Sequence, residues 1–192
     1  MRICVFLGSN AGRLPIYADT ARALGTLMAK RGIGLVYGGG TVGLMGILAD
    51  AATAAGGEVI GVIPQALRAR EHDHCGIAEL HVVETMHERK ALMAELSDGF
   101  VALPGGIGTF EELFEVWTWA QLGYHRKPCG LLNVAGFFDK MSGFIDHVVE
   151  DGFLRPEHRS MLIVADRPED MVDRLVDYVA PPTRQWIAEG DV

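Results

Sequence analysis

The stretch Val101-Ala-Leu-Pro-Gly-Gly-Ile-Gly-Thr-Phe-Glu-Glu-Leu113 passes from an apolar run through a glycine-rich turn into a helical pattern. Glycine lets the backbone adopt positive φ and approach a ligand closely. The helix that follows presents unpaired N–H groups and the positive end of its dipole. A phosphate is the kind of ligand that suits this arrangement.

A second turn of the same kind is Tyr37-Gly-Gly-Gly-Thr-Val-Gly-Leu-Met-Gly46. One glycine turn is a weak motif, because glycines also make tight strand–helix connections, but two in one chain favour ligand binding. No lysine follows the glycines as in a P-loop, and the spacing Gly8-Ser-Asn-Ala-Gly12 differs from the dinucleotide fingerprint, which disfavours nucleoside triphosphatase and dinucleotide chemistry. The residues predicted to cradle a phosphate are Gly8, Ser9, Gly38, Gly39, Gly40, Gly43 and Gly105.

Continuous apolar runs alternate with helical patterns along the rest of the chain, which predicts an α/β, Rossmann-like domain with a parallel sheet covered on both faces. In such sheets ligands bind outside the carboxyl ends of the strands, where the glycines cluster. Residues 65–78 show no clean period and are expected to form a polar loop. The expected strands are Arg2–Leu7, Gly34–Tyr37, Glu58–Ile63, Leu80–Val83, Gly99–Leu103, Gly130–Asn133 and Met161–Val164. The expected helices are Pro15–Arg31, Leu44–Ala55, His87–Leu96, Thr109–Leu122, Phe137–Val149 and Pro168–Val179.

Length and composition agree with one globular domain, expected over residues 1–180 with a peripheral tail over 181–192. The chain has 192 residues, of which 49% are hydrophobic and 22% charged, so it can bury a core. Its net charge of −8 argues against a nucleic-acid-binding surface. The first apolar run is too short for a signal peptide or a membrane span. Cys4, Cys75 and Cys129 are far apart and odd in number, which suggests reduced thiols in a cytoplasmic protein.

Glu112 has two interpretations. Thr109-x-x-Glu112 matches a helix capping box, with Thr109 as the N-cap and Glu112 reaching back, and this is the favoured reading from the residues alone. Alternatively, Glu112 is a carboxylate in the first helical turn, beside the phosphate, where it orients water or stabilises positive charge on a sugar. Glu111 and Glu115 are the neighbouring alternatives.

Arg89 and Lys90 stand near the start of an expected helix, where positive charge opposes the helix dipole. A bound phosphate would compensate, and Arg89 is the better candidate because arginine grips phosphate in a bidentate manner. Alternatively, Arg89 and Lys90 are solvated charges with Glu84 or Glu88 nearby, which explains their position equally well.

Two other groups of side chains receive structural interpretations. Glu71-His-Asp-His-Cys75 lacks a metal-binding spacing, so we expect a polar loop beside the pocket and no metal site. Trp117, Trp119 and Tyr124 are expected to pack in the core or at a subunit interface.

Together, Pro104-Gly-Gly-Ile-Gly-Thr-Phe-Glu-Glu112, Met86-His-Glu-Arg-Lys90 and the Tyr37 turn resemble the LOG ("Lonely Guy") family, and so does Thr118-Trp-Ala-Gln-Leu-Gly123. The resemblance covers residues 3–165. It implies a Rossmann-like homodimer that acts as a cytokinin riboside 5′-monophosphate phosphoribohydrolase, with no metal or organic cofactor. The older lysine decarboxylase label of such proteins would require pyridoxal phosphate on a lysine, and none of the four lysines lies in a recognisable cofactor motif.

The resemblance also implies roles for particular residues. Arg89 and Glu112 would be the catalytic pair of an N-glycosidase that releases a free base and ribose 5-phosphate. The residues implied in substrate binding are Glu71, Arg89, Lys90, Gly106, Ile107, Gly108, Thr109, Phe110, Glu111, Glu112 and Thr118.

Three functions stay open at this point. The first is hydrolysis of cytokinin nucleotides, and the second is a general purine nucleotide 5′-monophosphate nucleosidase that uses AMP. The third is a non-enzymatic carrier of a nucleotide or of molybdenum cofactor, which the Arg89–Glu112 combination disfavours.

Overall fold

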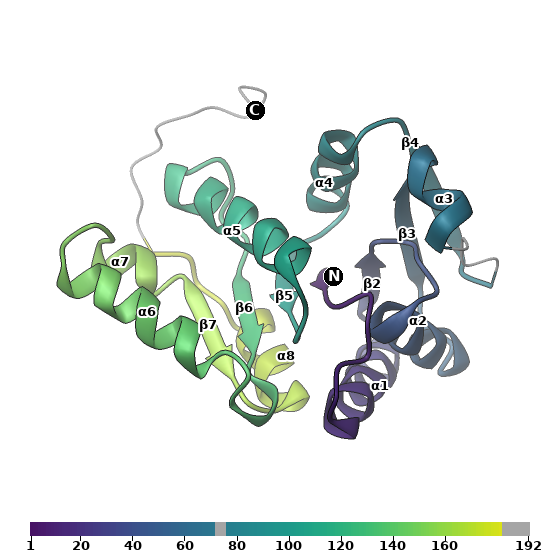
Figure 1. Cartoon of the computed structure of the whole chain (residues 1–192), viewed down its shortest axis with the longest axis horizontal. Helices are drawn as coiled ribbons and strands as arrows, with labels where there is room; N and C mark the ends of the chain where they lie inside the picture. Colours follow the sequence, from purple (N-terminus) through teal and green to yellow (C-terminus); the bar gives the residue numbers. More distant parts are fainter. Residues whose placement is uncertain (72–75, 182–192) are drawn as a thin grey trace.

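The computed structural model describes residues 1–71 and 76–181, without the side chains of residues 69–71. Seven parallel strands form one sheet in the order β4-β3-β2-β1-β5-β6-β7 (Figure 1). This topology confirms the predicted Rossmann-like α/β class. The strands are β1 (Arg2–Phe6), β2 (Gly34–Tyr37), β3 (Val59–Pro64), β4 (Glu79–Val83), β5 (Gly99–Ala102), β6 (Cys129–Leu132) and β7 (Leu162–Ala165).

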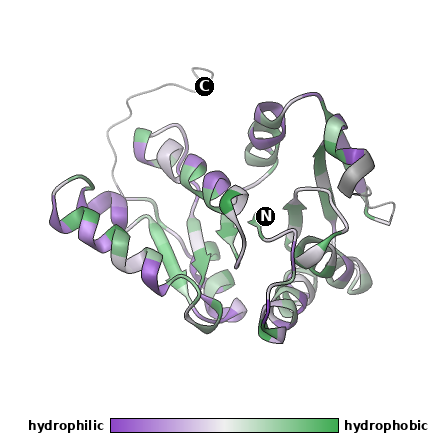
Figure 2. Cartoon of the chain, in the orientation of Figure 1, coloured by the Kyte–Doolittle hydropathy of each residue, from purple (hydrophilic) through white to green (hydrophobic). Residues whose placement is uncertain are grey.

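Helices cover both faces of the sheet (Figure 1). They are α1 (Pro15–Lys30), α2 (Gly43–Ala54), α3 (Gln65–Glu71), α4 (Met86–Glu95), α5 (Ile107–Leu122), η1 (Val134–Gly136), α6 (Asp139–Glu150), α7 (Pro156–Arg159) and α8 (Pro168–Val176). Side chains alternate along β1, so Ile3 and Val5 pack with α1, α2 and α8, whereas Cys4 and Phe6 pack with α4, α5 and α6. Figure 2 shows strands that are mainly hydrophobic, flanked by helices of which most mix hydrophilic and hydrophobic residues.

The expectation of a loop over 65–78 is wrong in its first half, because Gln65–Glu71 forms α3. Its residues Gln-Ala-Leu-Arg-Ala-Arg-Glu are all strong helix formers, so propensity predicts this helix although no apolar period does. Residues 72–75, which include most of the Glu71–Cys75 tract, lie outside the described part of the chain, as does the expected tail beyond residue 181.

The strand order changes direction at β1, because β2 to β4 lie on one side of it and β5 to β7 lie on the other. β1 pairs with β2 on one side and with β5 on the other. The carboxyl ends of β1 and β5 therefore flank the topological switch point, where open α/β sheets bind their ligands.

Cys4 and Cys129 are buried free thiols, as expected. Cys75 is outside the described residues. Among the helices of residues 1–71 and 76–181, none has the length and apolar character that a membrane crossing needs.

Candidate active site

The glycine turns meet at the switch point. The N–H of Gly8 donates to the carbonyl of Pro104 over 3.1 Å, and the carbonyl of Gly8 accepts from the N–H of Leu44 over 3.0 Å. A Cβ at Gly8 would stand 3.3 Å from Cα of Gly105. The three turns after β1, β2 and β5 are thus joined through Gly8, and glycine is required there because backbone presses on backbone.

Two further predicted cradle glycines have structural reasons of their own. Gly43 has φ of +60°, and a Cβ there would come 2.3 Å from the carbonyl carbon of Ser9. Gly39 has φ of +76°, and a Cβ there would press on Ile63 at 3.1 Å. Gly40 is buried and Ser9 is exposed. The cradle residues therefore lie together, but several of them are fixed by chain packing.

The first turn of α5 faces open space. The helix begins at Ile107, with Gly106 as an N-cap that has no side-chain hydrogen bond. A Cβ at Gly106 or Gly108 would meet nothing within 4 Å, and Ile107 is 86% exposed. The first N–H groups of a helix have no partner within it, so this turn presents donors and a positive dipole end to the surroundings. It has the properties of an anion site.

The predicted capping box at α5 is wrong. Thr109 is not the N-cap but lies inside the first turn, buried, and a Cβ at Gly105 would overlap its hydroxyl at 2.1 Å. Because the helix starts two residues earlier than expected, Glu112 stands in the second turn and not in the first. Glu112 therefore has no capping role, so helix capping does not explain why a glutamate stands at this position.

The capping interaction belongs to α4 instead. The Thr85 hydroxyl accepts from the N–H of Glu88 over 3.1 Å, and Glu88 Oε2 accepts from the N–H of Glu84 over 2.9 Å. The sequence carries the signal of this capping box as Thr85-x-x-Glu88. Glu88 therefore helps to cap the N-terminus of α4.

Arg89 is buried, which excludes the solvated-charge interpretation. Its Nη2 lies 3.4 Å from the carbonyl of Gly38 and 3.8 Å from Glu112 Oε1, while Nη1 lies 3.8 Å from Met86 Sδ. Nε has no hydrogen-bond partner among the described residues. A buried guanidinium with five donors and such long contacts is poorly satisfied, so it is available to an anionic ligand.

Glu112 has only 12% of its side chain exposed. Burial raises its pKa to about 7, an effect that Arg89 opposes and that Glu111 reinforces. No hydrogen bond to its carboxylate is recorded within the described residues. The group can therefore take both protonation states near neutral pH, a property that suits proton transfer or charge stabilisation.

Lys90 is also buried, against the solvated-charge interpretation, but it has partners. Its ammonium hydrogen-bonds to Glu111 and, over 3.0 Å, to Glu115. Burial works against the charge of Lys90, but these two hydrogen bonds raise its pKa. Lys90 thus ties α4 to the first half of α5 and holds that part of α5 in place.

The other predicted substrate contacts are more dispersed. Glu71 ends α3, and its side chain is outside what the structure describes. Phe110 is half-buried, with its ring edge-on to Phe138 at 6.3 Å. Thr118 is exposed, and its hydroxyl donates to the carbonyl of Phe114 over 2.6 Å.

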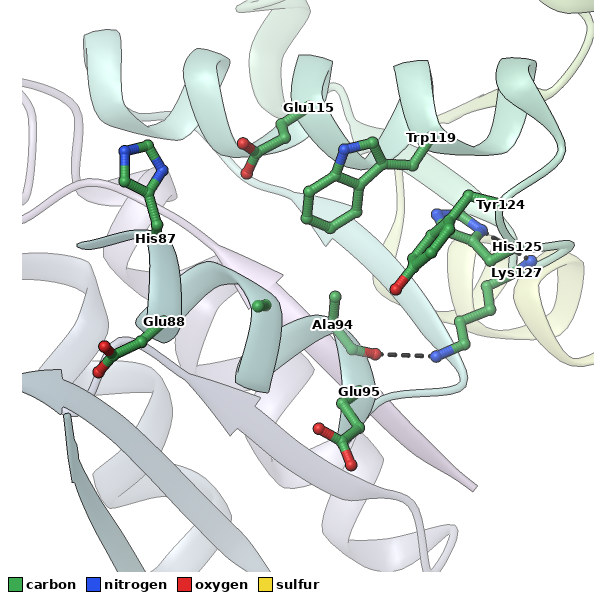
Figure 3. A pocket seen from close by; sticks show the side chains of 10 residues that line it. His87, Glu88, Ala94, Glu95, Glu115, Trp119, Tyr124, His125 and Lys127 are labelled. Carbon is green, nitrogen blue, oxygen red and sulfur yellow. Dashed lines mark hydrogen bonds between the residues drawn. The ribbon is translucent and has the colours of Figure 1, made fainter. Parts of the chain in front are cut away.

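A groove of about 790 Å³ lies between α4 and α5. Ala94 and Glu95 line it from α4, and Glu115 and Trp119 line it from α5 (Figure 3). Tyr124 closes one end, with its ring edge-on to Trp119 at 5.8 Å. Arg89 and Glu112 are not among the described residues that line this groove.

The predicted aromatic residues divide between core and groove. Trp117 is core, as expected, and its Nε1 donates to the carbonyl of His158 over 3.1 Å. Trp119 and Tyr124 line the groove, where an interface role stays a prediction.

Comparison with known proteins gives consistent relationships. A family model described as "possible lysine decarboxylase" matches residues 45–175. The chain is 52% identical over 178 residues to cytokinin riboside 5′-monophosphate phosphoribohydrolase LOG1 of Arabidopsis thaliana, which covers 93% of this chain and 84% of that protein. It is 51% identical over 178 residues to the enzyme LOG of Oryza sativa subsp. japonica, covering 93% and 74%.

Solved structures with this fold include the molybdenum cofactor carrier protein of Chlamydomonas reinhardtii. It has a TM-score of 0.70 and 23% identity, and the match covers 92% of this chain and 98% of the other. The molybdenum cofactor binding protein of Rippkaea orientalis has a TM-score of 0.67 and 22% identity, covering 90% and 93%. At these identities the likeness shows the fold alone.

Proposed function

The chain belongs to the LOG family of cytokinin riboside 5′-monophosphate phosphoribohydrolases, and we propose that it hydrolyses the N-glycosidic bond of N6-modified adenosine 5′-monophosphates. The relatives named above, at about half identity over most of the chain, support this activity. The observation that carries it is the 3.8 Å approach of the buried Arg89 to Glu112, beside the open start of α5. The products are the free base, an active cytokinin, and ribose 5-phosphate.

The 5′-phosphate binds at the first turn of α5, where the N–H groups of residues 107–109 and the helix dipole attract it. Arg89, poorly satisfied within the chain, donates to the same nucleotide. Lys90 supports this site through Glu111 and Glu115, which fix the start of α5. These interactions hold the ribose at a fixed position relative to Glu112.

Glu112 faces the ribose. Cleavage of a glycosidic bond passes through an oxocarbenium-like state, which an ionised carboxylate stabilises electrostatically. As the bond from C1′ to the base breaks, a water molecule oriented by Glu112 forms the new bond to C1′. One proton of that water ends on the departing base, so the reaction balances without a metal or an organic cofactor.

A general nucleosidase that uses AMP shares this chemistry and is the alternative. The test is incubation with AMP and with isopentenyladenosine monophosphate, followed by chromatographic measurement of free base and ribose 5-phosphate. Faster cleavage of the isopentenyl nucleotide supports the cytokinin activity, and equal cleavage favours the general nucleosidase. Absence of both products from both nucleotides contradicts an enzyme and favours a carrier.

We also propose that the protein is a cytoplasmic homodimer. The groove between α4 and α5 supports the dimer, because Ala91, Ala94, Trp119 and Tyr124 give it an apolar lining. Light scattering after size exclusion tests this proposal. Trp119→Glu, at a half-buried side chain of the groove, is expected to give monomers, whereas Phe153→Glu, at an exposed apolar side chain outside the groove, is expected to leave the dimer intact. The reverse pattern would place the interface elsewhere.

A further inference from the structure

Gly38, the residue that follows β2, touches the guanidinium of Arg89 directly. Its carbonyl oxygen lies 3.4 Å from Arg89 Nη2. A Cβ built on Gly38 would stand 2.0 Å from that nitrogen and 3.1 Å from Arg89 Cζ. The first distance is far below van der Waals contact and the second is tight, so the guanidinium occupies the space that any side chain at Gly38 would need.

The reason for glycine at this position differs from the reason at its neighbours. Gly39 and Gly43 have positive φ, which only glycine adopts readily, but Gly38 does not. The third neighbour of a Cβ at Gly38 is Met45 Sδ at 3.4 Å, an ordinary contact. The backbone at Gly38 therefore tolerates alanine, and the obstacle is one flexible side chain, that of Arg89.

The same nitrogen of Arg89 makes the approach to Glu112. Nη2 lies 3.4 Å from the Gly38 carbonyl and 3.8 Å from Glu112 Oε1, so a shift forced from one side changes the distance on the other. The rest of the guanidinium is held only weakly, because Nη1 has a long contact of 3.8 Å to Met86 Sδ and Nε has no hydrogen-bond partner among the described residues. The position of Arg89 thus depends on the space beside Gly38.

We propose that Gly38 is a positioning residue, which seats the Arg89 guanidinium against Glu112 by leaving room for Nη2. This inference rests on the proposed function for its effect on catalysis. It assigns Gly38 to the catalytic pair and not to the phosphate, in contrast to its place among the predicted cradle residues. The nucleotide then meets an arginine already held at the carboxylate, and no part of the binding energy is spent on moving it.

The environment of Glu112 supplies a readout for the position of Arg89. The groups that act on Glu112 are Arg89 and Lys90 from α4, Glu111 and Glu115 from α5, and the buried thiol of Cys4 from β1. Of the two cations, Arg89 is the stronger influence and lowers the pKa of Glu112. If Arg89 is pushed away, that pKa rises further.

The test compares Gly38→Ala with Gly143→Ala, a control in α6 where a Cβ would meet nothing within 4 Å. Both variants are expected to fold, because the only close atoms in the first case end a flexible side chain. Gly38→Ala is expected to lower kcat/KM for isopentenyladenosine monophosphate roughly tenfold to a hundredfold, as misplacement of a catalytic group by about 1 Å does. It also raises the pKa of Glu112, measured by carbon-13 NMR of labelled glutamate, whereas Gly143→Ala changes neither.

A double-mutant cycle with Arg89→Lys separates positioning from general damage. Lysine has no Nη2, so Gly38→Ala is expected to cost nothing more in the Arg89→Lys background. An equal loss in both backgrounds, or wild-type kcat/KM and wild-type Glu112 titration in Gly38→Ala, would overturn the inference. If the wild-type protein cleaves neither nucleotide, the proposed function fails, but the Glu112 titration still decides the role of Gly38.

Discussion

Nη2 of Arg89 lies 3.8 Å from Oε1 of Glu112, with 8% and 12% of the two side chains exposed. Because both side chains are buried, water screens the attraction between the two charges only weakly. The loss of hydration nevertheless disfavours the ionised carboxylate by more than the single arginine stabilises it. The consequence is a pKa of about 7 for Glu112, raised mainly by burial. Several measurable properties depend on this balance.

The rate of hydrolysis should increase with pH through neutrality. If the ionised carboxylate stabilises the ribose, kcat for isopentenyladenosine monophosphate rises as Glu112 loses its proton near pH 7 and then levels off. Profiles of kcat between pH 5 and pH 9 test this, since they report the enzyme–substrate complex. A kcat that falls through the same range would instead indicate a protonated Glu112 acting as an acid.

The stability of the protein should fall as pH rises from about 4.5 to about 7. Glu112 keeps its proton in the folded state up to about pH 7, whereas in the unfolded chain it releases it near the ordinary value of 4.5. The folded state therefore binds more protons between these values, and the free energy of unfolding decreases as pH rises, by about 3 kcal/mol at most. Urea unfolding of the wild type and Glu112→Gln tests this, because the glutamine variant should lack that decrease.

Removal of the Lys90 charge should affect both stability and the pH profile. Lys90→Met leaves the half-buried carboxylate of Glu115 without its lysine partner and removes a cation that lowers the pKa of Glu112. We expect a loss of roughly 1–3 kcal/mol in unfolding free energy and a shift of the kcat profile to higher pH. The control is Arg22→Ala, which breaks an exposed pair with Asp19 and should cost less than about 1 kcal/mol. An unchanged profile in Lys90→Met would show that Lys90 does not act on Glu112.

The start of α4 should depend on its cap. Thr85→Ala removes the acceptor for the N–H of Glu88 and should cost about 1 kcal/mol. Thr53→Ala, at an exposed position within α2, should change the unfolding free energy by less than about 0.5 kcal/mol. Equal effects in chemical denaturation would contradict the capping assignment.

Most of the fold could be predicted because its elements are marked locally. Apolar runs such as Gly34–Tyr37 end at glycine turns, and Pro15 and Pro168 stand at the first positions of their helices. The helix α3 cannot be predicted from periodicity, because its apolar residues do not recur at helical spacing. Only the helix propensity of its residues indicates it.

The site residues could be selected from the sequence, but their relationships could not. Thr109-x-x-Glu112 and Thr85-x-x-Glu88 are the same pattern. The start of α5 at Ile107 excludes the first as a cap, and the hydrogen bond from the Glu88 N–H to the Thr85 hydroxyl identifies the second as the cap of α4. Arg89 and Lys90 are adjacent in sequence, yet one faces Glu112 and the other binds Glu111 and Glu115. The contact of Gly38 with Arg89 joins residues 51 positions apart, and only tertiary packing places them together.

The most direct test of the proposed function is the turnover of isopentenyladenosine monophosphate by the wild type and by Glu112→Gln, with base and ribose 5-phosphate quantified together. Glutamine keeps the size of the side chain but cannot ionise, so binding should survive while kcat falls by about 10² to 10⁴. The wild type should release the two products in equal amounts. Wild-type turnover by Glu112→Gln would contradict the role assigned to this carboxylate.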